Sequence, residues 1–335
     1  MSVQVATGPF GLAVTDPALD RRISAGLAAV EELLGASTNS GRDFISTAAG
    51  HLMAAGGKRF RPMLTLVAAE FGDRLAPGVV PAAAVVELTH LATLYHDDVM
   101  DEAAMRRGAA SANARWGNSI AILTGDFLFA KASQILADLG PEAVRLQAET
   151  FERLVTGQIN ECVGPRPDEA AIDHYLQVLA DKTGSLIATS ARFGALLAGA
   201  PAPVVDLLTR FGETFGVAFQ LSDDVLDIAS DSEQSGKTPG TDLREGVPTL
   251  PTLYALASTD PESARLRDLL SAPIADDALV EEVLAALRGH PALDQARATV
   301  ARYADEARQL LADLPELPAK AALLALCDVV VSRTV

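Results

Sequence analysis

Helix-forming residues fill almost every segment of this chain, and glycine or proline interrupts them about every 15 to 25 residues. The hairpin pattern, alternating apolar and polar residues around Asn-Gly or Asp-Gly, does not occur. The sequence therefore predicts an all-α fold. We expect helices near residues 17–35, 41–54, 61–72, 81–104, 118–138, 141–162, 169–181, 183–199, 203–229, 248–257, 261–271, 276–288, 291–313 and 317–333.

The chain is long and apolar enough for one large core. It has 335 residues, of which 49% are hydrophobic, and this fraction excludes disorder as a global description. No linker divides it, so we expect a single domain over residues 1–335, with the informative motifs between about 50 and 255. The segment 230–248 is polar and rich in glycine and proline, which is typical of functional or mobile loops.

The charge balance restricts the possible partners. Lysine and arginine number 27 and aspartate and glutamate 44, so the formal net charge is −17 and nucleic-acid binding is disfavoured. The first 15 residues lack the pattern of a secretory signal, and no stretch reaches the roughly 18 to 20 uncharged apolar residues of a membrane span. Two cysteines are too few for a disulfide framework. We therefore expect a soluble, cytoplasmic protein.

The motif Asp-Asp-x-x-Asp occurs twice, each time at the end of a long apolar run. The two copies are Asp97, Asp98 and Asp101, and Asp223, Asp224 and Asp227. On a helix the first and last aspartates share one face, where like charges are unfavourable unless a cation neutralises them. Carboxylates suit Mg²⁺, whose coordination is usually completed by water and phosphate. The motifs predict magnesium sites for a diphosphate; two solvated acidic helix ends are the alternative.

Basic residues with the complementary charge lie near these motifs. Lys58 and Arg61 fall in a glycine-led turn before a helix, and both side chains suit a phosphate or diphosphate. Arg106 and Arg107 follow the first aspartate cluster within two turns. An ordinary basic helix start, and salt bridges to the neighbouring aspartates, are the alternatives.

Histidine and lysine positions extend this pattern. His90 lies two turns before Asp97 on the same helical face, although a histidine buried in the core is the alternative. Of the five lysines, Lys58, Lys182 and Lys237 occupy the basic turn, a helix junction and the long polar loop. These three are placed where a polyanionic ligand would meet them.

Several segments match the motifs of one enzyme family in the same order. They are GGKRFRP (56–62), ELTHLATLYHDDVMDEAAMRRG (87–108), GQINE (157–161), DKTGSL (181–186), GVAFQLSDDVLD (216–227) and GKTPGTDLREGVPTLP (236–251). Over these segments the chain resembles the trans-polyprenyl diphosphate synthases, which lengthen isoprenyl diphosphates. A set of ordered motifs is far more specific than one Asp-Asp-x-x-Asp.

The resemblance implies an isoprenoid-synthase-type helical bundle around a central cavity, with the aspartate clusters on opposite walls, and a homodimer. It implies that several Mg²⁺ ions are bound by Asp97, Asp98, Asp101, Asp223, Asp224 and Asp227. It implies that the allylic diphosphate is held by Arg106, Lys182, Thr183, Gln220 and Lys237. It implies that isopentenyl diphosphate is held by Lys58, Arg61, His90 and Arg107.

The same resemblance implies a prenyltransferase of isoprenoid biosynthesis. Cations promote departure of the allylic diphosphate, and the allylic cation alkylates the double bond of isopentenyl diphosphate. Because water would quench that cation, the 230–248 loop is our candidate lid. The catalytic set implied in this way is Asp97, Asp98, Asp101, Arg106, Lys182, Asp223, Asp224 and Lys237.

Product length is predicted from the helix that carries Asp97. The positions facing the growing chain, Thr89, Ala92 and Thr93, are small or medium, and the resemblance implies bulky aromatics at the positions of Ala92 and Thr93 in short-chain members of the family. This favours a long product of about C30 to C50, used as a quinone side chain, with at most peripheral membrane contact for its release. The alternative is that another helix closes the tunnel through Phe151 or Leu154.

Other functions are compatible with parts of the pattern. A short-chain farnesyl or geranylgeranyl diphosphate synthase (C15 to C20) and the catalytic subunit of a heteromeric synthase are the main alternatives. A class I terpene cyclase would lack the second Asp-Asp-x-x-Asp and the basic turn, and a non-catalytic subunit would lack some of the aspartates. An inactive acidic helical scaffold does not account for the ordered motifs.

Overall fold

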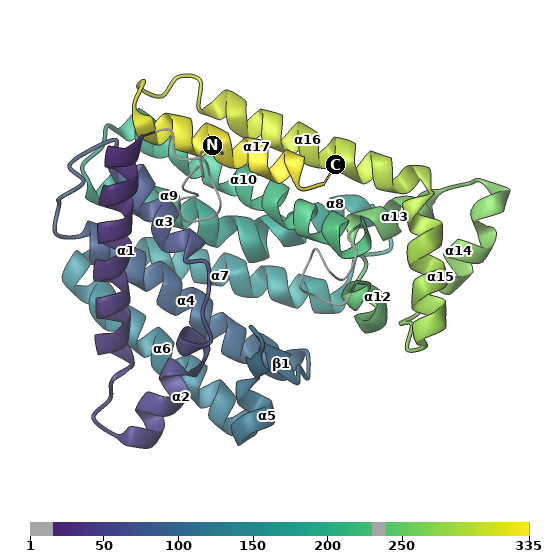
Figure 1. The fold of residues 1–335 in the computed structure, drawn as a ribbon, viewed down its shortest axis with the longest axis horizontal. Helices are drawn as coiled ribbons and strands as arrows, with labels where there is room; N and C mark the ends of the chain where they lie inside the picture. Colours follow the sequence, from purple (N-terminus) through teal and green to yellow (C-terminus); the bar gives the residue numbers. More distant parts are fainter. Residues whose placement is uncertain (1–15, 230–238, 335) are drawn as a thin grey trace, which may run out of the picture. The chain divides into compact units, whose positions relative to one another are not determined.

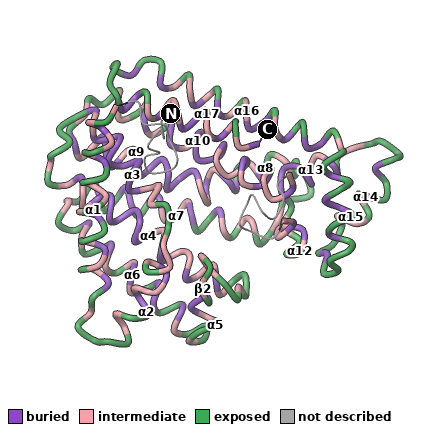
Figure 2. The backbone as a smooth tube through the Cα atoms, in the orientation of Figure 1, coloured by how far each residue is buried: buried purple, intermediate pink, exposed green. Residues whose placement is uncertain are grey.

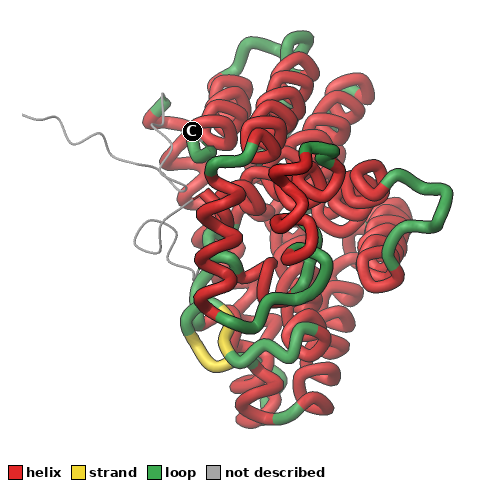
Figure 3. The backbone as a smooth tube through the Cα atoms, turned by 90° about the vertical axis from the view of Figure 1, so that its right-hand side faces the viewer, coloured by secondary structure: helices red, strands yellow, loops and turns green. Residues whose placement is uncertain are grey.

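The computed structural model describes residues 16–229 and 239–334, and these are almost entirely helical (Figures 1 and 3), which confirms the all-α prediction. In the described part the only strands are β1 (Met105–Arg106) and β2 (Ala109–Ala110), paired antiparallel. The helices are α1 (Pro17–Thr38), α2 (Asp43–Ala54), α3 (Phe60–Ala69), α4 (Val79–Met100), α5 (Ala112–Trp116), α6 (Asn118–Leu139), α7 (Pro141–Val163), α8 (Ala171–Leu179), η1 (Ala180–Gly184), α9 (Ser185–Leu197), α10 (Ala202–Ala229), α12 (Thr241–Glu245), α13 (Leu250–Ala257), η2 (Pro261–Ser263), α14 (Ala264–Leu269), α15 (Asp277–Arg288), α16 (Pro291–Leu310) and α17 (Pro318–Ser332).

Local sequence signals explain where these helices begin. Asp16 precedes α1, its side chain accepts hydrogen bonds from the backbone N–H groups of Ala18 (2.7 Å) and Leu19 (2.9 Å), and Pro17 occupies the first helical position. Asp276 starts α15 in the same way. Such caps satisfy backbone donors that the helix itself leaves unpaired, so the predicted starts agree closely with the observed ones.

The chain divides into two compact units. The first comprises residues 1–152, 186–212 and 313–323, and the second comprises residues 153–185, 213–312 and 324–335. Each is described below by itself. The expectation of a single domain stays a prediction.

In the first unit, α4 is the central helix. It packs most extensively against α6 and also contacts α1 and α3, and long stretches of α3 and α4 are buried (Figure 2). Gly125 allows the close approach of α6, because a Cβ atom there would lie 3.0 Å from the Ala92 carbonyl oxygen and 2.3 Å from His96 Nε2. This packing fixes the helix that ends in the first aspartate cluster.

In the second unit, α13 packs against α8 and α16, and α8 continues directly into the π-helical turn η1. This turn lies at the Lys182 junction, where the sequence predicted a boundary between two helices. Single π turns within helices are frequent at functional sites.

One expectation about membrane segments needs correction. α6 is long and apolar enough to cross a membrane by length and composition, whereas the sequence analysis found no such stretch. The difference arises because that search required uncharged residues, and α6 carries a few charged ones among apolar residues. Only 33% of its apolar window is buried, so α6 presents an apolar face beyond its contact with α4.

Candidate active site

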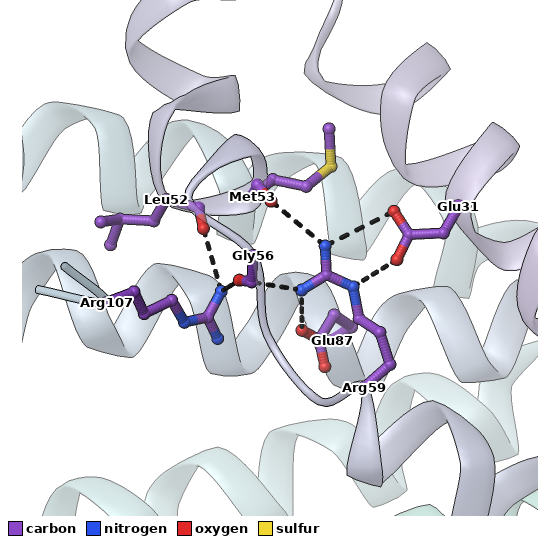
Figure 4. A network of polar contacts seen from close by, with 7 residues as sticks. All are labelled: Glu31, Leu52, Met53, Gly56, Arg59, Glu87 and Arg107. Carbon is purple, nitrogen blue, oxygen red and sulfur yellow. Dashed lines mark hydrogen bonds and ion pairs between the residues drawn. The ribbon is translucent and has the colours of Figure 1, made fainter. Parts of the chain in front are cut away.

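Arg59 organises the basic turn in the first unit (Figure 4). It adopts a left-handed backbone conformation (φ 50°) just before α3. Its guanidinium pairs with Glu31, with Glu87 (3.2 Å) and with the carbonyl oxygens of Met53 (3.3 Å) and Gly56 (3.4 Å). Arg59 therefore holds the loop in place and is not among the residues that sequence reasoning assigned to a ligand.

Arg107 holds the other side of the same loop. Its Nη1 donates to the carbonyl oxygens of Leu52 (2.9 Å) and Gly56, as Figure 4 shows. A Cβ atom at Gly57 would lie 2.6 Å from Arg59 Nη1 and 2.9 Å from Arg107 Nη1. The glycine pair thus allows two guanidinium groups to approach the loop backbone, which explains the start of the GGKRFRP motif.

Arg61 and His90 lie close to Arg107 in this unit. Lys58 is exposed, while Arg61 Nε is buried and has no hydrogen-bond partner in the described structure. Burial lowers the pKa of Arg61 to about 10, against the opposing effect of Glu87. Burial, with the charges of Arg61 and Arg107, also keeps the pKa of His90 well below its usual 6.5. A buried guanidinium nitrogen without an acceptor among several cations is suited to an anionic ligand.

The first aspartate cluster lies at the C-terminal end of α4. Asp98 is fully buried, and its Oδ1 accepts from Arg106 Nε at 2.5 Å, while Arg106 Nη2 lies 3.5 Å from Asp101 Oδ2. The turn that follows α4 leads directly into β1, which carries Arg106 back to Asp98. Asp98 Oδ2 is buried with no hydrogen-bond partner in the described structure. Asp97 and Asp101 lie one turn apart, as the sequence predicted.

The second cluster lies near the end of α10 in the second unit. Asp224 is buried (6% exposed), and its two oxygens accept from Tyr175 Oη and from Gln220 Nε2 (3.1 Å). Burial raises the pKa of Asp224 to about 6, although both hydrogen bonds oppose this shift. Asp223 pairs with Arg333. The middle aspartate is therefore held by neutral groups inside the unit.

Asp227 occupies the other end of this cluster. Its carboxylate accepts from the backbone N–H groups of Thr241 (3.4 Å) and Asp242 (3.3 Å) at the start of α12. It therefore ties α10 to the segment that follows residues 230–238. Residues 230–238 of the predicted lid, including Lys237, lie outside the described residues.

Lys182 and Thr183 lie in the π turn η1 of the second unit. Lys182 Nζ donates to Glu161 Oε2 at 2.5 Å. A Cβ atom at Gly157 would lie 2.6 Å from the Lys182 backbone nitrogen, so only glycine permits α7 to approach this turn so closely. The GQINE motif therefore supplies both the close contact and the carboxylate partner of Lys182.

The predicted site residues thus fall into two sets. The first unit contains Lys58, Arg61, His90, Asp97, Asp98, Asp101, Arg106 and Arg107, and the second contains Lys182, Thr183, Gln220, Asp223, Asp224 and Asp227. Sequence reasoning missed Arg59 and Glu87, although both lie inside the quoted motifs. It also missed Tyr175, whose only signal is its place on the apolar face of a short helix, and Arg333, for which we find no signal.

Neither cluster forms a closed metal cage. Within residues 16–229 and 239–334, no three His, Cys, Asp or Glu side chains come together as such a site. Paired carboxylates at i and i+4 nevertheless fit a hard divalent ion, because Mg²⁺ is usually bound by one or two carboxylates plus water and substrate phosphates. The donor set therefore fits a metal bound together with a diphosphate.

The first unit also contains a cavity of about 460 Å³. It is lined by His96, Asp126, Phe129, Ala132, Ser133, Leu136, Val144, Gln147, Ala148 and Phe151. Phe129 and Phe151 contact each other with ring centroids 4.4 Å apart. Gln147 donates to Thr89 Oγ1 at 2.8 Å, so one predicted chain-length residue borders the cavity wall, whereas Ala92 and Thr93 are not part of its lining.

Comparison with known proteins identifies the class of this chain. The sequence model described as Polyprenyl synthetase matches residues 42–287, and the chain belongs to this family. It is a prenyltransferase, and the prediction of a trans-polyprenyl diphosphate synthase is confirmed.

Individual relatives cover almost the whole chain. A nonaprenyl diphosphate synthase of Mycobacterium tuberculosis is 50% identical over 98% of this chain and 98% of its own length. An octaprenyl diphosphate synthase of Escherichia coli is 34% identical over 92% of this chain and 95% of its own length. The names of these relatives support the long-chain type.

Solved structures agree on the fold. A geranylgeranyl pyrophosphate synthase of Corynebacterium glutamicum, complexed with calcium and isoprenyl diphosphate, has a TM-score of 0.87 at 49% identity and covers 96% of this chain and 99% of its own. A decaprenyl diphosphate synthase of Rhodobacter capsulatus has a TM-score of 0.86 at 34% identity, with 95% and 99% covered. The isoprenoid-synthase-type fold is therefore confirmed.

Proposed function

We propose that this chain adds isopentenyl diphosphate units to an allylic diphosphate and releases an all-trans polyprenyl diphosphate of about C30 to C50 for a quinone side chain. The observation that carries this proposal is the cationic site around Arg61, whose buried Nε has no acceptor in the described structure. A diphosphate supplies that acceptor and the charge that the neighbouring cations require.

Each condensation exchanges one bond for another. The allylic carbon–oxygen bond breaks and its electron pair leaves with the diphosphate. The double bond of isopentenyl diphosphate then attacks the allylic carbon, and a proton passes to the released diphosphate. We assign isopentenyl diphosphate to Lys58, Arg61, His90 and Arg107, and the allylic diphosphate to Arg106, Lys182, Thr183, Gln220 and Lys237. These cations stabilise charge on the leaving group.

We assign the metal to the aspartates at the ends of the clusters, Asp97, Asp101 and Asp223, with Asp98, Asp224 and Asp227 in or near the coordination shell. Mg²⁺, when bound, neutralises the diphosphate and makes it a better leaving group. Two findings support this assignment: the paired carboxylates described above, and the calcium and isoprenyl diphosphate named in the similar Corynebacterium structure. We propose that the metal is magnesium and that each active site binds several ions.

For product length we favour the cavity of the first unit as the place where the growing chain ends. Its lining is mostly apolar, and Phe129 and Phe151 form an aromatic contact within it. This favours the alternative in which α6 and α7, rather than Thr89, Ala92 and Thr93 alone, set the length. Phe151→Ala should lengthen the main product, whereas Ala92→Phe should shorten it.

We further propose a cytoplasmic homodimer in which α6 covers its counterpart in a second copy. Ile122 and Leu123 of α6 are 43% and 62% exposed, and Val144 of α7 is 44% exposed. Large exposed apolar side chains in one region indicate an interaction surface. Sedimentation should give a dimer for the wild-type chain and a larger monomer fraction for Leu123→Glu. Membrane contact is then peripheral and serves product release.

A catalytic subunit of a heteromeric synthase is the second candidate. It is favoured by one relative named heptaprenyl diphosphate synthase component 2, from Geobacillus stearothermophilus, which is 40% identical over 88% of this chain and 91% of its own length. This candidate requires that the purified chain make no product until a partner is added.

The decisive experiment uses the purified chain alone with Mg²⁺, isopentenyl diphosphate and, separately, geranyl, farnesyl and geranylgeranyl diphosphates. Products are dephosphorylated and sized by mass spectrometry. Our proposal predicts products of C30 or longer. A main product of C15 or C20 would leave the enzyme class intact and overturn the long-chain assignment, and no product from any primer would favour the heteromeric alternative.

A further inference from the structure

We propose that Tyr175 is a positioning residue of the second aspartate cluster, which it orients for metal binding by holding Asp224. This inference rests on the proposed function, because it assumes that the cluster binds a metal–diphosphate complex. Tyr175 lies on α8, far in sequence from the cluster, and none of the motifs above includes it.

The contacts of Asp224 carry the argument. Tyr175 is buried (8% exposed) and its hydroxyl donates to Asp224 Oδ2, while Gln220 Nε2 donates to Oδ1. Both oxygens of this carboxylate are thus engaged by neutral donors inside the second unit. Oxygens held in this way orient the side chain inward, as outer-shell hydrogen bonds do around many metal ligands.

The outer carboxylates of this cluster have partners of their own. Asp223 pairs with Arg333, and Asp227 accepts from the backbone N–H groups of Thr241 and Asp242. Asp223 and Asp227 share one face of α10, and both are less buried than Asp224. The Tyr175 hydroxyl therefore acts on the middle carboxylate, whose orientation it fixes.

Tyr175 adds no charge of its own beside Asp224. Its hydroxyl holds this carboxylate as a neutral donor, whereas Asp223 in the same cluster pairs with a cation, Arg333. An uncharged hydroxyl is thus suited to orienting the middle carboxylate of the cluster.

The test compares Tyr175→Phe with the wild type and with a matched control. Tyr254 lies on α13 of the same unit, and its hydroxyl contacts Thr299 Oγ1 at 3.0 Å, away from the aspartates. Tyr254→Phe therefore removes a comparable hydroxyl. For each protein we would measure the Mg²⁺ concentration for half-maximal activity, the KM for isopentenyl diphosphate, and the rise in melting temperature on adding Mg²⁺ with inorganic diphosphate.

We expect Tyr175→Phe to raise the half-saturating Mg²⁺ concentration about tenfold, the lower end of the usual effect of losing an outer-shell partner. The KM for isopentenyl diphosphate should stay within twofold, and the melting-temperature rise should shrink. Tyr254→Phe should leave all three measurements near the wild-type values. Adding Tyr175→Phe to Asp224→Ala should change the Mg²⁺ requirement no further, since Asp224→Ala already removes the acceptor of the Tyr175 hydroxyl.

Equal Mg²⁺ requirements in Tyr175→Phe and Tyr254→Phe would overturn the inference, as would independent, multiplicative effects of Tyr175→Phe and Asp224→Ala. The activity of the wild type distinguishes failure of this inference from failure of the proposed function. An active wild type with an unaffected Tyr175→Phe refutes only the positioning role, whereas a wild type without any Mg²⁺-dependent condensation refutes the proposed function itself.

Discussion

The two aspartate clusters have the same sequence pattern but different internal partners. In the first, the middle residue Asp98 is buried against a cation, Arg106, at 2.5 Å. In the second, the middle residue Asp224 is buried against the neutral groups of Tyr175 and Gln220. In both clusters the middle aspartate is buried, whereas the two outer aspartates are more exposed. The comparison indicates that one motif can be anchored by either charge pairing or neutral hydrogen bonding.

The largest expected effect comes from the outer aspartates. Asp97→Ala and Asp223→Ala should each lower kcat by about 10²- to 10³-fold, because each removes a charge-stabilising group that acts in the transition state. Asp206→Ala, at an exposed position of α10, is the matched control and should leave kcat unchanged. Steady-state kinetics at saturating Mg²⁺ provides the measurement. A large loss of kcat in only one of the two variants would show that the two clusters do not contribute equally to catalysis.

Next in size is the effect of Arg61, which separates the basic residues around the glycine-led turn of the first unit from the second unit. Arg61→Met should raise the KM for isopentenyl diphosphate about 10- to 100-fold, since hydrogen bonds to charged groups contribute about 1.5–3 kcal/mol. The KM for the allylic substrate should change little. Arg145→Met, exposed on α7, serves as the control. A larger change in the KM for the allylic substrate would assign Arg61 to the allylic diphosphate instead.

Neutralising each middle aspartate tests whether Asp98 and Asp224 are anchored in different ways. Asp98→Asn should lower the free energy of unfolding by about 2 kcal/mol, because it leaves the partly buried Arg106 without its partner charge. Asp224→Asn should cost about 1 kcal/mol or less, since its neutral partners can still hydrogen-bond the amide. Urea unfolding without Mg²⁺ measures both. Equal decreases in the free energy of unfolding would show that Asp98 and Asp224 are not held by different kinds of interaction.

The smallest expected effect is a pH dependence from His90. Its pKa is held well below 6.5 in the folded chain by burial and neighbouring arginines, so below pH 6.5 the unfolded chain binds the proton preferentially. Stability should therefore fall as the pH drops, by up to about 1 kcal/mol between pH 6.5 and 5.5. The stability of His90→Asn should fall by up to about 1 kcal/mol less than that of the wild type over the same pH interval. Identical pH profiles for the two proteins would argue against a neutral His90.

Much of the fold was accessible from the sequence because the helix starts carry local signals. Asp16 with Pro17 before α1, and Asp276 before α15, fix boundaries through hydrogen bonds within a few residues. The β1–β2 hairpin was not predicted, because two-residue strands have no alternation to detect. The exposed apolar side chains of α6, such as Ile122 and Leu123, were missed because polar residues interrupt the apolar run in sequence.

The candidate site was predictable only where its chemistry is contiguous in sequence. The aspartates and the basic turn form short motifs, so their residue types could be interpreted together. The roles of Arg59 and Tyr175 depend on partners tens of residues away, such as Glu31 and Asp224. No local pattern records such contacts, and only the packed helices bring them together.

The most direct test of this account is a crystal structure of the chain with Mn²⁺ and inorganic diphosphate, with Mn²⁺ located by its anomalous scattering. We predict that manganese lies within ligand distance of Asp97, Asp101 and Asp223, with Asp98 still on Arg106 and Asp224 still on Tyr175. Manganese bound away from these three outer carboxylates, or loss of both the Asp98–Arg106 and the Asp224–Tyr175 contacts, would contradict the account.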